Sequence, residues 1–530
     1  MLTPAQLKDL IQDELLPAYN ADKERQDQIV DWLSAKALEI FVPRGANAEY
    51  EMLRSQSKFN VLKLIVKQLA QDLFVDGYRS TSESGLAPSS DNAPIWRLVW
   101  QPNRMDARQR MPYRAAIQFG WSYATVLPGT RTVRRRVDAG DEIDPAVEPP
   151  AAAYEMVTEP VPVITPWSPR RFVACYDDEL NDEWATYAMH VHRPKRAGRP
   201  SRLLSSQGRP LDPDIGARLT VYDDGFVYDV KKLARGGGKA SWDLIGIREH
   251  GMGVVPVVRW LDEWDCDEMP EGKIWPLIAP QKQLDQATFQ ITMIQNFASW
   301  MQRWISGMAE EAPGFRARID AVWKSTSAET KFGEFSASDP GPVLRSREAI
   351  LQFISAVAQV APHQLVLAAG ISNISADALV ALQTSHDHDV GDHKTSFGES
   401  DEQLFRLGGL AVSVTAGATQ EQIDIGLDAW YDTSAQVVWR DTTPRSLAQI
   451  ADALGKLATQ LGIPPEALWE RIPGVTQQDI ERWREMRGQA NLLDRIEGML
   501  GQADDEVLVE GPEMEEPALV GVASNGSGAV

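Results

Sequence analysis

The sequence has little of several features that mark whole classes of protein. Its 530 residues include two cysteines, Cys175 and Cys266, too few for a disulfide framework, and no Cys-x-x-Cys pair of the kind that holds zinc. It also lacks a Gly-x-x-x-x-Gly-Lys-[Ser/Thr] loop, a Gly-x-Ser-x-Gly elbow and a His-Glu-x-x-His motif. These absences argue against a disulfide-stapled secreted domain, a P-loop motor ATPase and the hydrolases that use those motifs.

Long apolar runs are missing as well. Charged residues such as Lys8 and Asp13 interrupt the apolar positions of the first thirty residues, which excludes the core of a signal peptide. The nearest approach to a membrane span is the uncharged run 286–302, whose Gln and Asn side chains would be costly in lipid. We expect no membrane span and a protein that stays in the reducing cytoplasm where it is made.

Positive charge is in short supply: 53 Lys and Arg face 75 Asp and Glu, a formal net charge of −22. A protein that coats nucleic acid neutralises phosphates with surplus Lys and Arg, so this balance argues against that role. It does not exclude a protein that DNA merely passes. With 43% hydrophobic residues, the length predicts about three or four folded units.

The first half of the chain mixes predicted helices and strands. Residues 4–70 read as helices, and strand-like runs at 219–222 and 226–230 flank a turn at 223–225. The segment 140–169, rich in Pro, Ala and Glu, predicts a long surface loop. The fold class we expect is α+β, predominantly helical.

An arginine-rich stretch runs from Arg97 to Arg136, across a predicted helix and the predicted loop that follows Gly129. Its cluster Arg131 to Arg136 is suited either to nucleic acid or to an acidic protein surface. Short basic clusters are more often exposed loops than DNA contacts, so both readings stay open.

A helix predicted over 277–305 carries two apolar stripes. One stripe is Leu277, Leu284, Ala287, Ile291, Ile294, Ala298, Met301 and Ile305, and the other is Phe289, Met293, Phe297, Trp300 and Trp304. A surface helix normally has one apolar stripe, so this helix packs on two sides. It is either a central core helix of a large domain or a helix wedged between identical neighbours in a ring.

Two more helices follow a short irregular module. Residues 309–342 read as a small compact excursion, and a second helix is predicted over 346–361, ending before Pro362. A third helix starts near Asn373 or Ser375, with predicted interruptions at Gly391 and Gly398.

A cluster of histidine and aspartate lies on that third helix. If the helix is continuous, His386, Asp389 and His393 share one face, and two imidazoles with a carboxylate could hold zinc or a similar ion. The plainer interpretation is a hydrated polar turn near Gly391. In a ring, the repeated histidines could also form a pH-sensitive collar.

The C-terminal part is predicted to be helical over 446–461, 465–470 and 476–499. The last thirty residues hold seven acidic side chains from Asp504 to Glu516 and no Lys or Arg, which is typical of a disordered acidic tail.

Several local strings, taken in order, resemble those of one known family. The strings are Trp100 to Gly129, His250 to Val258, Phe332 to Phe335, Asn373 to Leu379, and Trp439 to Asp441 followed by Pro444 to Ser446. Their order and spacing resemble the portal proteins of tailed double-stranded DNA bacteriophages, of the long-tailed siphophage type, over roughly residues 10–490.

The resemblance implies a phage portal fold with wing, stem, clip and crown, assembled as a ring around a central channel. Its parts would be the wing (1–275), stem helix 1 (276–308), clip (309–343), stem helix 2 (344–362), tunnel loop (363–374), kinked helix and wing return (375–445), crown helices (446–500) and disordered acidic tail (501–530). The two apolar stripes of the first stem helix would then face neighbouring subunits.

The resemblance also implies a function. Such a ring, of about twelve copies, occupies one capsid vertex of the virion and is the channel for DNA packaging and ejection. Its partners would be double-stranded DNA, the terminase large subunit, the head-tail adaptor or connector, the major capsid protein and the scaffold, with the host cytoplasm as the place of assembly. It would be no enzyme and would need no cofactor or metal.

The resemblance also suggests residues for each role. DNA-channel residues would be His363, Gln364 and Asn373; stem residues at the subunit interface would be Ile291, Ile294, Phe297, Met301, Trp304, Ile354 and Val357; clip docking residues would be Phe315, Arg316, Arg318 and Trp323. Two alternatives stay open: a metal-dependent hydrolase using His386, Asp389 and His393, and a non-portal intracellular scaffold protein.

Overall fold

The structure is a computed structural model that describes most of the chain. The described residues are 1–36, 40, 48–80, 94–136, 154–179, 181–192, 218–233, 241–299, 303–307, 329–334, 339–361, 376–440 and 447–469, with short pieces between 472 and 487. They divide into two compact units, Met1–Thr442 and Thr443–Val530. None of the described helices is long and apolar enough to span a membrane.

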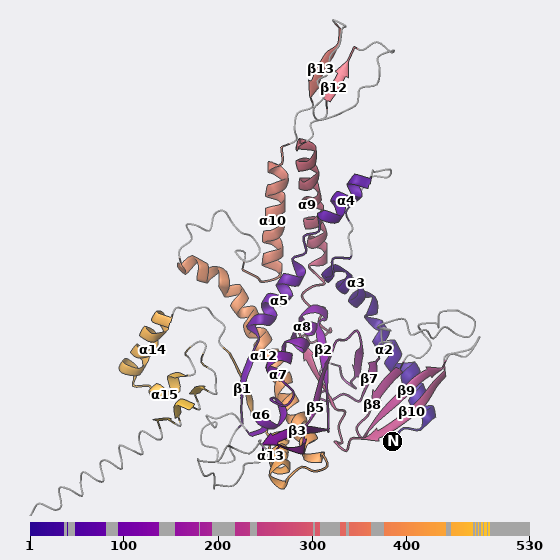
Figure 1. Cartoon of the computed structure of the whole chain (residues 1–530), viewed down its shortest axis with the longest axis vertical. Coiled ribbons are helices and arrows are strands. Elements are labelled where there is room, and N and C mark those ends of the chain that lie inside the picture. The colour runs from indigo at the N-terminus through magenta and orange to yellow at the C-terminus, as the bar shows by residue number, and fades with distance from the viewer. Residues whose placement is uncertain are drawn as a thin grey trace, which may run out of the picture. The chain divides into compact units, whose positions relative to one another are not determined.

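The first unit is α+β, as predicted, and mixes helices with small antiparallel sheets (Figure 1). Its helices are α1 (Pro4–Leu10), the π-helical turn η1 (Ile11–Leu15), α2 (Leu16–Ala21), α3 (Lys23–Leu33), α4 (Ala48–Gln56), α5 (Leu62–Asp72), α6 (Pro94–Val99), α7 (Met105–Arg108), α8 (Arg110–Phe119), α9 (Ile278–Ser299), α10 (Gly341–Val357), α12 (Ala376–Val414) and α13 (Gln420–Tyr431). The second unit contains α14 (Leu447–Leu461) and α15 (Pro465–Leu468).

Among the described residues, the strands form five sheets, often from segments that are distant in sequence. A five-stranded sheet has the order β10 (Ser241–Glu249), β9 (Phe226–Leu233), β8 (Arg218–Tyr222), β7 (Tyr187–Val191), β6 (Phe172–Cys175), and a three-stranded sheet has the order β11 (Val257–Leu261), β2 (Trp121–Leu127), β5 (Val163–Trp167). Three strand pairs complete the set: β1 (Val75–Arg79) with β14 (Gln436–Trp439), β3 (Thr130–Arg136) with β4 (Tyr154–Pro160), and β12 (Arg303–Ser306) with β13 (Lys331–Glu334).

The five-stranded sheet is covered on both faces because its side chains alternate. On β6, Phe172 and Ala174 pack toward Trp121 and other residues of β2 and β11. Val173, between them, belongs to a separate cluster with Leu7, Leu10, Ile11 and Leu15 of the N-terminal helices. The period of two along a strand sends neighbours to opposite faces, which explains both layers.

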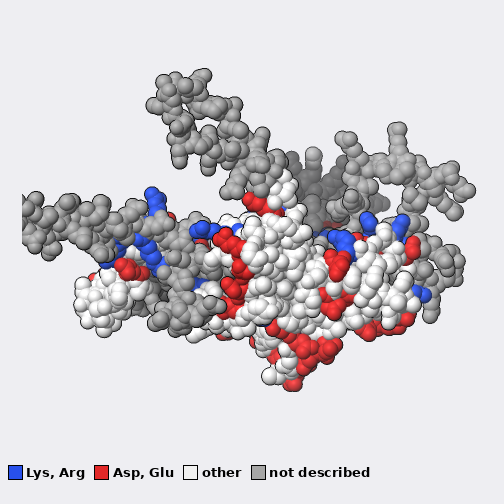
Figure 2. All heavy atoms as spheres, turned by 90° about the horizontal axis from the view of Figure 1, so that it is seen from below, with Lys and Arg blue, Asp and Glu red and all other residues white. Residues whose placement is uncertain are grey.

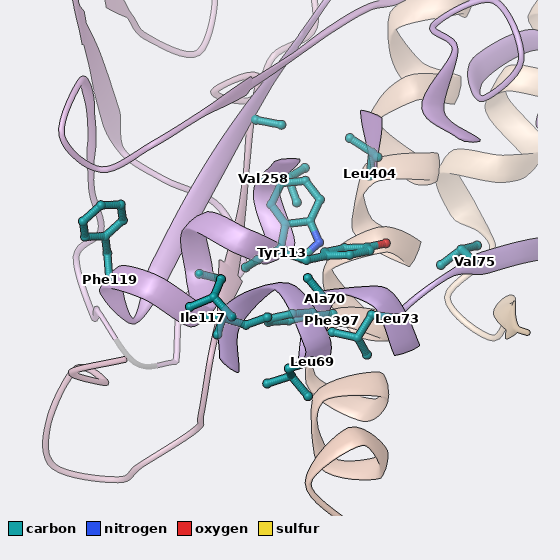
Figure 3. Packing of buried hydrophobic residues seen from close by; sticks show 14 of the residues in the cluster. Leu69, Ala70, Leu73, Val75, Tyr113, Ile117, Phe119, Val258, Phe397 and Leu404 are labelled. Atoms are coloured by element: carbon teal, nitrogen blue, oxygen red, sulfur yellow. The ribbon is translucent and has the colours of Figure 1, made fainter. Parts of the chain in front are cut away.

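The main core lies where α5, α8 and α12 meet β2 and β11. Figure 3 shows Leu69 and Ala70 of α5, Tyr113 and Ile117 of α8 and Phe397 and Leu404 of α12 gathered there. The rings of Tyr113 and Phe397 stack with centroids 5.2 Å apart. The predicted apolar face Leu62, Ile65, Val66 and Leu69 of α5 is fully buried in this core, which confirms it.

Several boundaries differ from the sequence prediction. The first long helix ends at Ser299 rather than near 305, because Trp304 and Ile305 pair as strand β12 with Gly333 and Phe332. The second spans Gly341–Val357 rather than 346–361. In both places tertiary context decides where a local apolar pattern stops being helical.

Two loop predictions are wrong, and the third helix is continuous where interruptions with a bend were predicted. Residues 130–136 and 154–160 form the ladder β3–β4, and 163–167 form β5, where surface loops were expected. Helix α12 runs through Gly391 and Gly398 without a break. In Figure 1 its N-terminal part nevertheless runs in a different direction from the rest of the helix.

Candidate interface and the polar strip of helix α12

Helices α9 and α10 lie side by side, and the β12–β13 hairpin lies beyond their end in Figure 1. Helix α10 has two apolar faces with different surroundings. Leu351 and Ile354 point into the main core and are 4% and 0% exposed. Phe353 and Val357, on the other side, are 59% and 42% exposed. A helix that leaves a phenylalanine and a valine this exposed presents an apolar surface on which another molecule could pack.

Helix α9 uses its two apolar stripes inside one chain. Leu277 and Leu284 belong to the main core. Phe289, from the other stripe, packs with Ile40 and with Leu53 of α4, and Met293 lies against the same cluster. The two-sided packing is confirmed, but in the described part of the helix the second side is covered by the chain's own N-terminal segment rather than left open for a neighbour.

Polar side chains of α9 reinforce this attachment. The Gln281 amide donates to the backbone carbonyl of Phe59 at 2.8 Å and to the Asp285 carboxylate at 3.0 Å. Asp285 in turn accepts from the backbone N–H of Phe59 at 3.2 Å. The segment between α4 and α5 is therefore hydrogen-bonded to α9 through buried groups, which satisfies backbone atoms that would otherwise be unpaired.

Some of the predicted interface residues are buried within the single chain and others are exposed. Ile354 has no exposed surface and Ile291 only 8%, so both pack within the single chain. Ile294 is half-buried. Val357 is exposed on α10, and Trp304 is 38% exposed on strand β12. The side chain of Phe297 and the whole of Met301 lie outside the described residues.

The β12–β13 hairpin carries aromatic residues on its surface. Trp304 pairs with Gly333 across the ladder, and a Cβ atom added to Gly333 would come within 2.4 Å of the indole ring, so only glycine fits there. Phe332 is 45% exposed. The predicted clip residues Phe315, Arg316, Arg318 and Trp323, and the predicted channel residues His363, Gln364 and Asn373, lie outside the described residues.

His386, Asp389 and His393 share one face of the continuous helix α12, as predicted, and all three are buried. Each reaches a different element. His386 Nε2 lies 2.9 Å from Asp72, the last residue of α5. Asp389 forms an ion pair with Lys273, in the turn before α9. His393 Nε2 lies 2.9 Å from Asp262, immediately after β11. We call these three residues the polar strip of α12.

The partners of the strip decide its charges. Burial alone lowers the pKa of His393, but the hydrogen bonds and charges of Asp262 and Asp389 outweigh it and raise the pKa to about 10. The pKa of His386 is also raised, because Asp72 outweighs burial. Burial raises the pKa of Asp389, yet His393 and Lys273 bring it below its ordinary value. At neutral pH His393 is therefore an imidazolium and Asp389 a carboxylate, and the charged form of His386 is favoured over that of a free imidazole.

These contacts engage His386 Nε2, both ring nitrogens of His393 and the Asp389 carboxylate, which are atoms that a metal could use. A metal binds neutral imidazole, whereas the partners of both imidazoles favour the charged form and hold His393 in it at neutral pH. His393 also uses its other nitrogen, which lies 2.7 Å from the Asp389 carbonyl oxygen. In the part of the chain that the structure describes, no group of three or more His, Cys, Asp or Glu side chains is arranged to hold a metal ion. The hydrolase alternative therefore loses its ligand set.

Sequence reasoning found the strip but missed its partners. Asp72, Asp262 and Lys273 are more than a hundred residues away from the strip in the sequence. Nothing in the local sequence around them indicates that they contact α12. Of the two cysteines, Cys175 is half-buried and Cys266 is exposed.

The arginine cluster is not a free loop. In the β3–β4 ladder Arg131 lies opposite Glu159, and Arg135 lies opposite Glu155. The Arg131 side chain is exposed and donates to the carbonyl oxygen of Pro102 at 3.2 Å. This register places acidic residues directly across from two of the arginines, as expected for a charge-matched strand pair.

Comparison with known proteins gives one family. The model of the family described as "Phage portal protein, SPP1 Gp6-like" matches residues 12–492 of this chain. Among solved structures, a chain from "Neck of empty GTA particle computed with C6 symmetry" aligns with 81% of this chain and 93% of its own length, at 11% sequence identity and a TM-score of 0.30, a likeness too weak to carry an argument. The search of curated proteins finds no match.

Proposed function

Because the chain belongs to the phage portal protein family, SPP1 Gp6-like, we propose that it assembles into a ring of about twelve copies at one capsid vertex. Portal proteins are structural components of the phage particle rather than enzymes. DNA would enter the head through the channel of this ring during packaging and leave through it during ejection.

The family match over residues 12–492 carries this proposal. The outer face of α10 supports it, because Phe353 and Val357 remain exposed in the single chain. We assign α9 and the part of α10 from residue 344 onward to the stem, residues 309–343 to the clip and 363–374 to the tunnel loop. On this assignment the contact between stems runs through α10 and leaves out Ile354, which the chain buries by itself.

Native mass spectrometry and negative-stain electron microscopy of the purified protein test the ring. We expect closed rings of about twelve subunits. Phe353→Glu should reduce or abolish them, because a carboxylate would be desolvated in an apolar contact. Gln352→Glu is the matched control, since it adds the same charge at an exposed neighbouring position on α10. A purified protein that remains monomeric or dimeric would favour the scaffold alternative.

The acidic character of the chain suits a channel through which DNA slides. Neutralising phosphates with Lys and Arg binds DNA by counterion release, whereas an acidic or uncharged wall does not hold it. Acidic side chains form patches over the middle of the described surface seen in Figure 2. We assign His363, Gln364 and Asn373 to the part of the channel nearest the DNA.

Added charge tests this placement. His363→Lys combined with Gln364→Lys should slow packaging and increase DNA retention, because two cations per subunit would attract the phosphates. Gln352→Lys, which adds charge on the stem surface, is the control. An unchanged packaging rate and unchanged retention in the double variant would show that these residues do not face DNA.

The clip, residues 309–343, is our proposed dock for the terminase large subunit and later for the head-tail adaptor. Its described part includes the exposed Phe332 on β13, and the paired strand β12, just before the clip, carries the exposed Trp304. Aromatic side chains of this kind are enriched in protein interfaces. The major capsid protein and the scaffold would contact other surfaces of the ring during assembly in the host cytoplasm.

A further inference from the structure

The polar strip of α12 connects this helix to three parts of the first unit at once. His386 reaches the end of α5, Asp389 reaches the turn before α9, and His393 reaches the residue after β11. These positions are three and four residues apart, so they lie on one line along the helix. Fixing one helix to three separate elements restricts its direction more than any single contact would.

The contacts on the two sides of Gly391 differ. His393, after the glycine, is 3% exposed and is bound to Asp262, which is 7% exposed. His386 and Asp389, before it, depend on Asp72 and Lys273, whose side chains are 30% and 16% exposed. Water therefore reaches the partners of the upstream residues more easily, so these contacts should open before the downstream one.

Gly391 itself offers a place for the helix to bend. A Cβ atom added there would meet no heavy atom within 4 Å, so no neighbouring element braces the backbone at this point. Glycine destabilises a helix relative to alanine and accompanies many bends. The change in direction of α12 visible in Figure 1 lies in its N-terminal part.

Lys273 lies where several elements meet. Besides its ion pair with Asp389, its ammonium group donates to the Gln359 side chain at 3.4 Å, just after α10. The Lys273 ammonium group thus joins α12 to the start of α9 and to the end of α10. A movement of the upstream part of α12 would have to break this junction.

We propose that the polar strip is a latch, which holds the part of α12 before Gly391 against α5 and the base of the α9–α10 hairpin, and whose release lets that part turn at Gly391. Only the role of the latch depends on the proposed function. The released part of α12 follows residues 363–374, which we assign to the part of the channel nearest the DNA. The latch itself is a property of the single chain.

The groups facing the strip favour its charged state. Asp389 and His393 of the strip, with their partners Lys273 and Asp262, lie at the wall of a hollow of about 910 Å³. The other charged residues lining that hollow are all acidic: Glu263, Asp265, Glu268, Glu271, Asp392 and Glu399. Asp387 and Asp389 also raise the pKa of His386. Acids around an imidazolium stabilise it, so the lining of this hollow favours the charged form of His393.

The signs of these shifts give the latch a pH window. The raised pKa of His386 means that its contribution is complete below the ordinary value of 6.5 and is lost as the pH rises through its value in the folded protein. The lowered pKa of Asp389 means that its contribution is present above the ordinary value of 3.8 and is lost as the pH falls below it. The latch should therefore be tightest between these two values.

Hydrogen exchange measured by mass spectrometry on the purified full-length protein tests the latch. His386→Gln and Asp389→Asn should each speed exchange of the amides over residues 380–390 by about tenfold or more, because each removes a charged contact that holds this part of the helix to a neighbouring element. Gly391→Ala should slow exchange there by stiffening the helix. The controls are His388→Gln and Asp392→Asn, the same substitutions at exposed positions of the same helix, which should change exchange less than about twofold.

Three results would overturn the proposal. One is unchanged exchange over 380–390 in both strip variants. Another is an equal acceleration in β2 and β11, which would mean that the strip supports the whole fold rather than a local opening. The third is measured on the wild-type protein. It is a protection of the amides of residues 380–390 from hydrogen exchange that does not fall as the pH rises from 6.5 to 10. None of these measurements depends on ring formation, so failure of the latch and failure of the portal assignment are distinguishable.

Discussion

Asp389 and Asp401 lie on the same helix and are both almost completely buried, with 5% and 1% of their surface exposed. Asp389 is surrounded by cations, Lys273 on one side and the imidazolium of His393 on the other. Asp401 has only neutral partners: the Tyr113 hydroxyl donates to it at 2.6 Å and the Trp260 indole N–H at 3.2 Å. The two carboxylates therefore have opposite electrostatic surroundings.

Their pKa values diverge accordingly. Burial raises the pKa of Asp401 to about 8, because the two neutral donors only partly offset the loss of water. The same effect of burial acts on Asp389, but its cationic partners lower the pKa below the ordinary value. The comparison teaches that the partner decides whether a buried carboxyl group of this protein is a charge or a neutral hydrogen-bonding group.

The largest effect should come from Asp389→Asn. This variant leaves Lys273 and His393 buried without their shared counter-charge, and such a loss typically costs about 3–5 kcal/mol. Urea denaturation followed by circular dichroism at pH 6 would measure it. A loss below about 1 kcal/mol would mean that water already compensates these cations.

Tyr113→Phe should have a smaller effect. It removes the closer of the two donors to Asp401 and leaves a fully buried acceptor with one partner, which costs about 1–3 kcal/mol. The same denaturation experiment measures it. Tyr19→Phe removes a hydroxyl that donates to the Arg170 carbonyl in a part-buried place, so it is a suitable control with a lesser expected loss.

Asp401→Asn should have the smallest effect at pH 7, within about 1 kcal/mol, because the wild-type carboxyl is largely protonated there and asparagine keeps its shape. The variant sharpens the comparison through pH. A raised pKa means that the wild-type contribution is complete below the ordinary value of 3.8 and is lost as the pH rises through about 8.

Stability measured from pH 5 to pH 9 should therefore decline less in Asp401→Asn than in the wild-type protein, and the two curves should converge or cross near pH 8. Parallel curves would show that Asp401 is ionised across the range. Applied to position 389, the same substitution should give the opposite dependence at low pH, where protonation of the wild-type Asp389 removes the difference between the two proteins.

Local pattern was enough to predict several elements. The apolar period of α5 gave its buried face, and the two stripes of α9 gave its packing on two sides. The C-terminal end of α9 could not be predicted from local pattern. Trp304 and Ile305 continue the helical spacing of apolar residues, but they form a strand because they pair with β13. Local pattern also failed for β3 and β4, which were expected to be loops. Arg131 lies opposite Glu159 in a ladder between strands whose pairing local sequence does not specify.

The candidate sites show a similar division. The periodicity of α12 was sufficient to place His386, Asp389 and His393 on one face, and the composition left metal binding and a polar turn open. The choice between them depends on Asp72, Asp262 and Lys273, which approach only after α5, β11 and the start of α9 have packed around the core.

The sequence by itself determined the family, the α+β class and which residues share a helix face, because periodicity and local strings are properties of neighbouring residues. Only the tertiary structure decided what those faces meet. Phe289 packs on the chain's own α4 region, Phe353 meets solvent, and the imidazole of His393 meets carboxylates. The free energy of each contact depends on groups distant in sequence, since burial and charge act through space rather than along the chain.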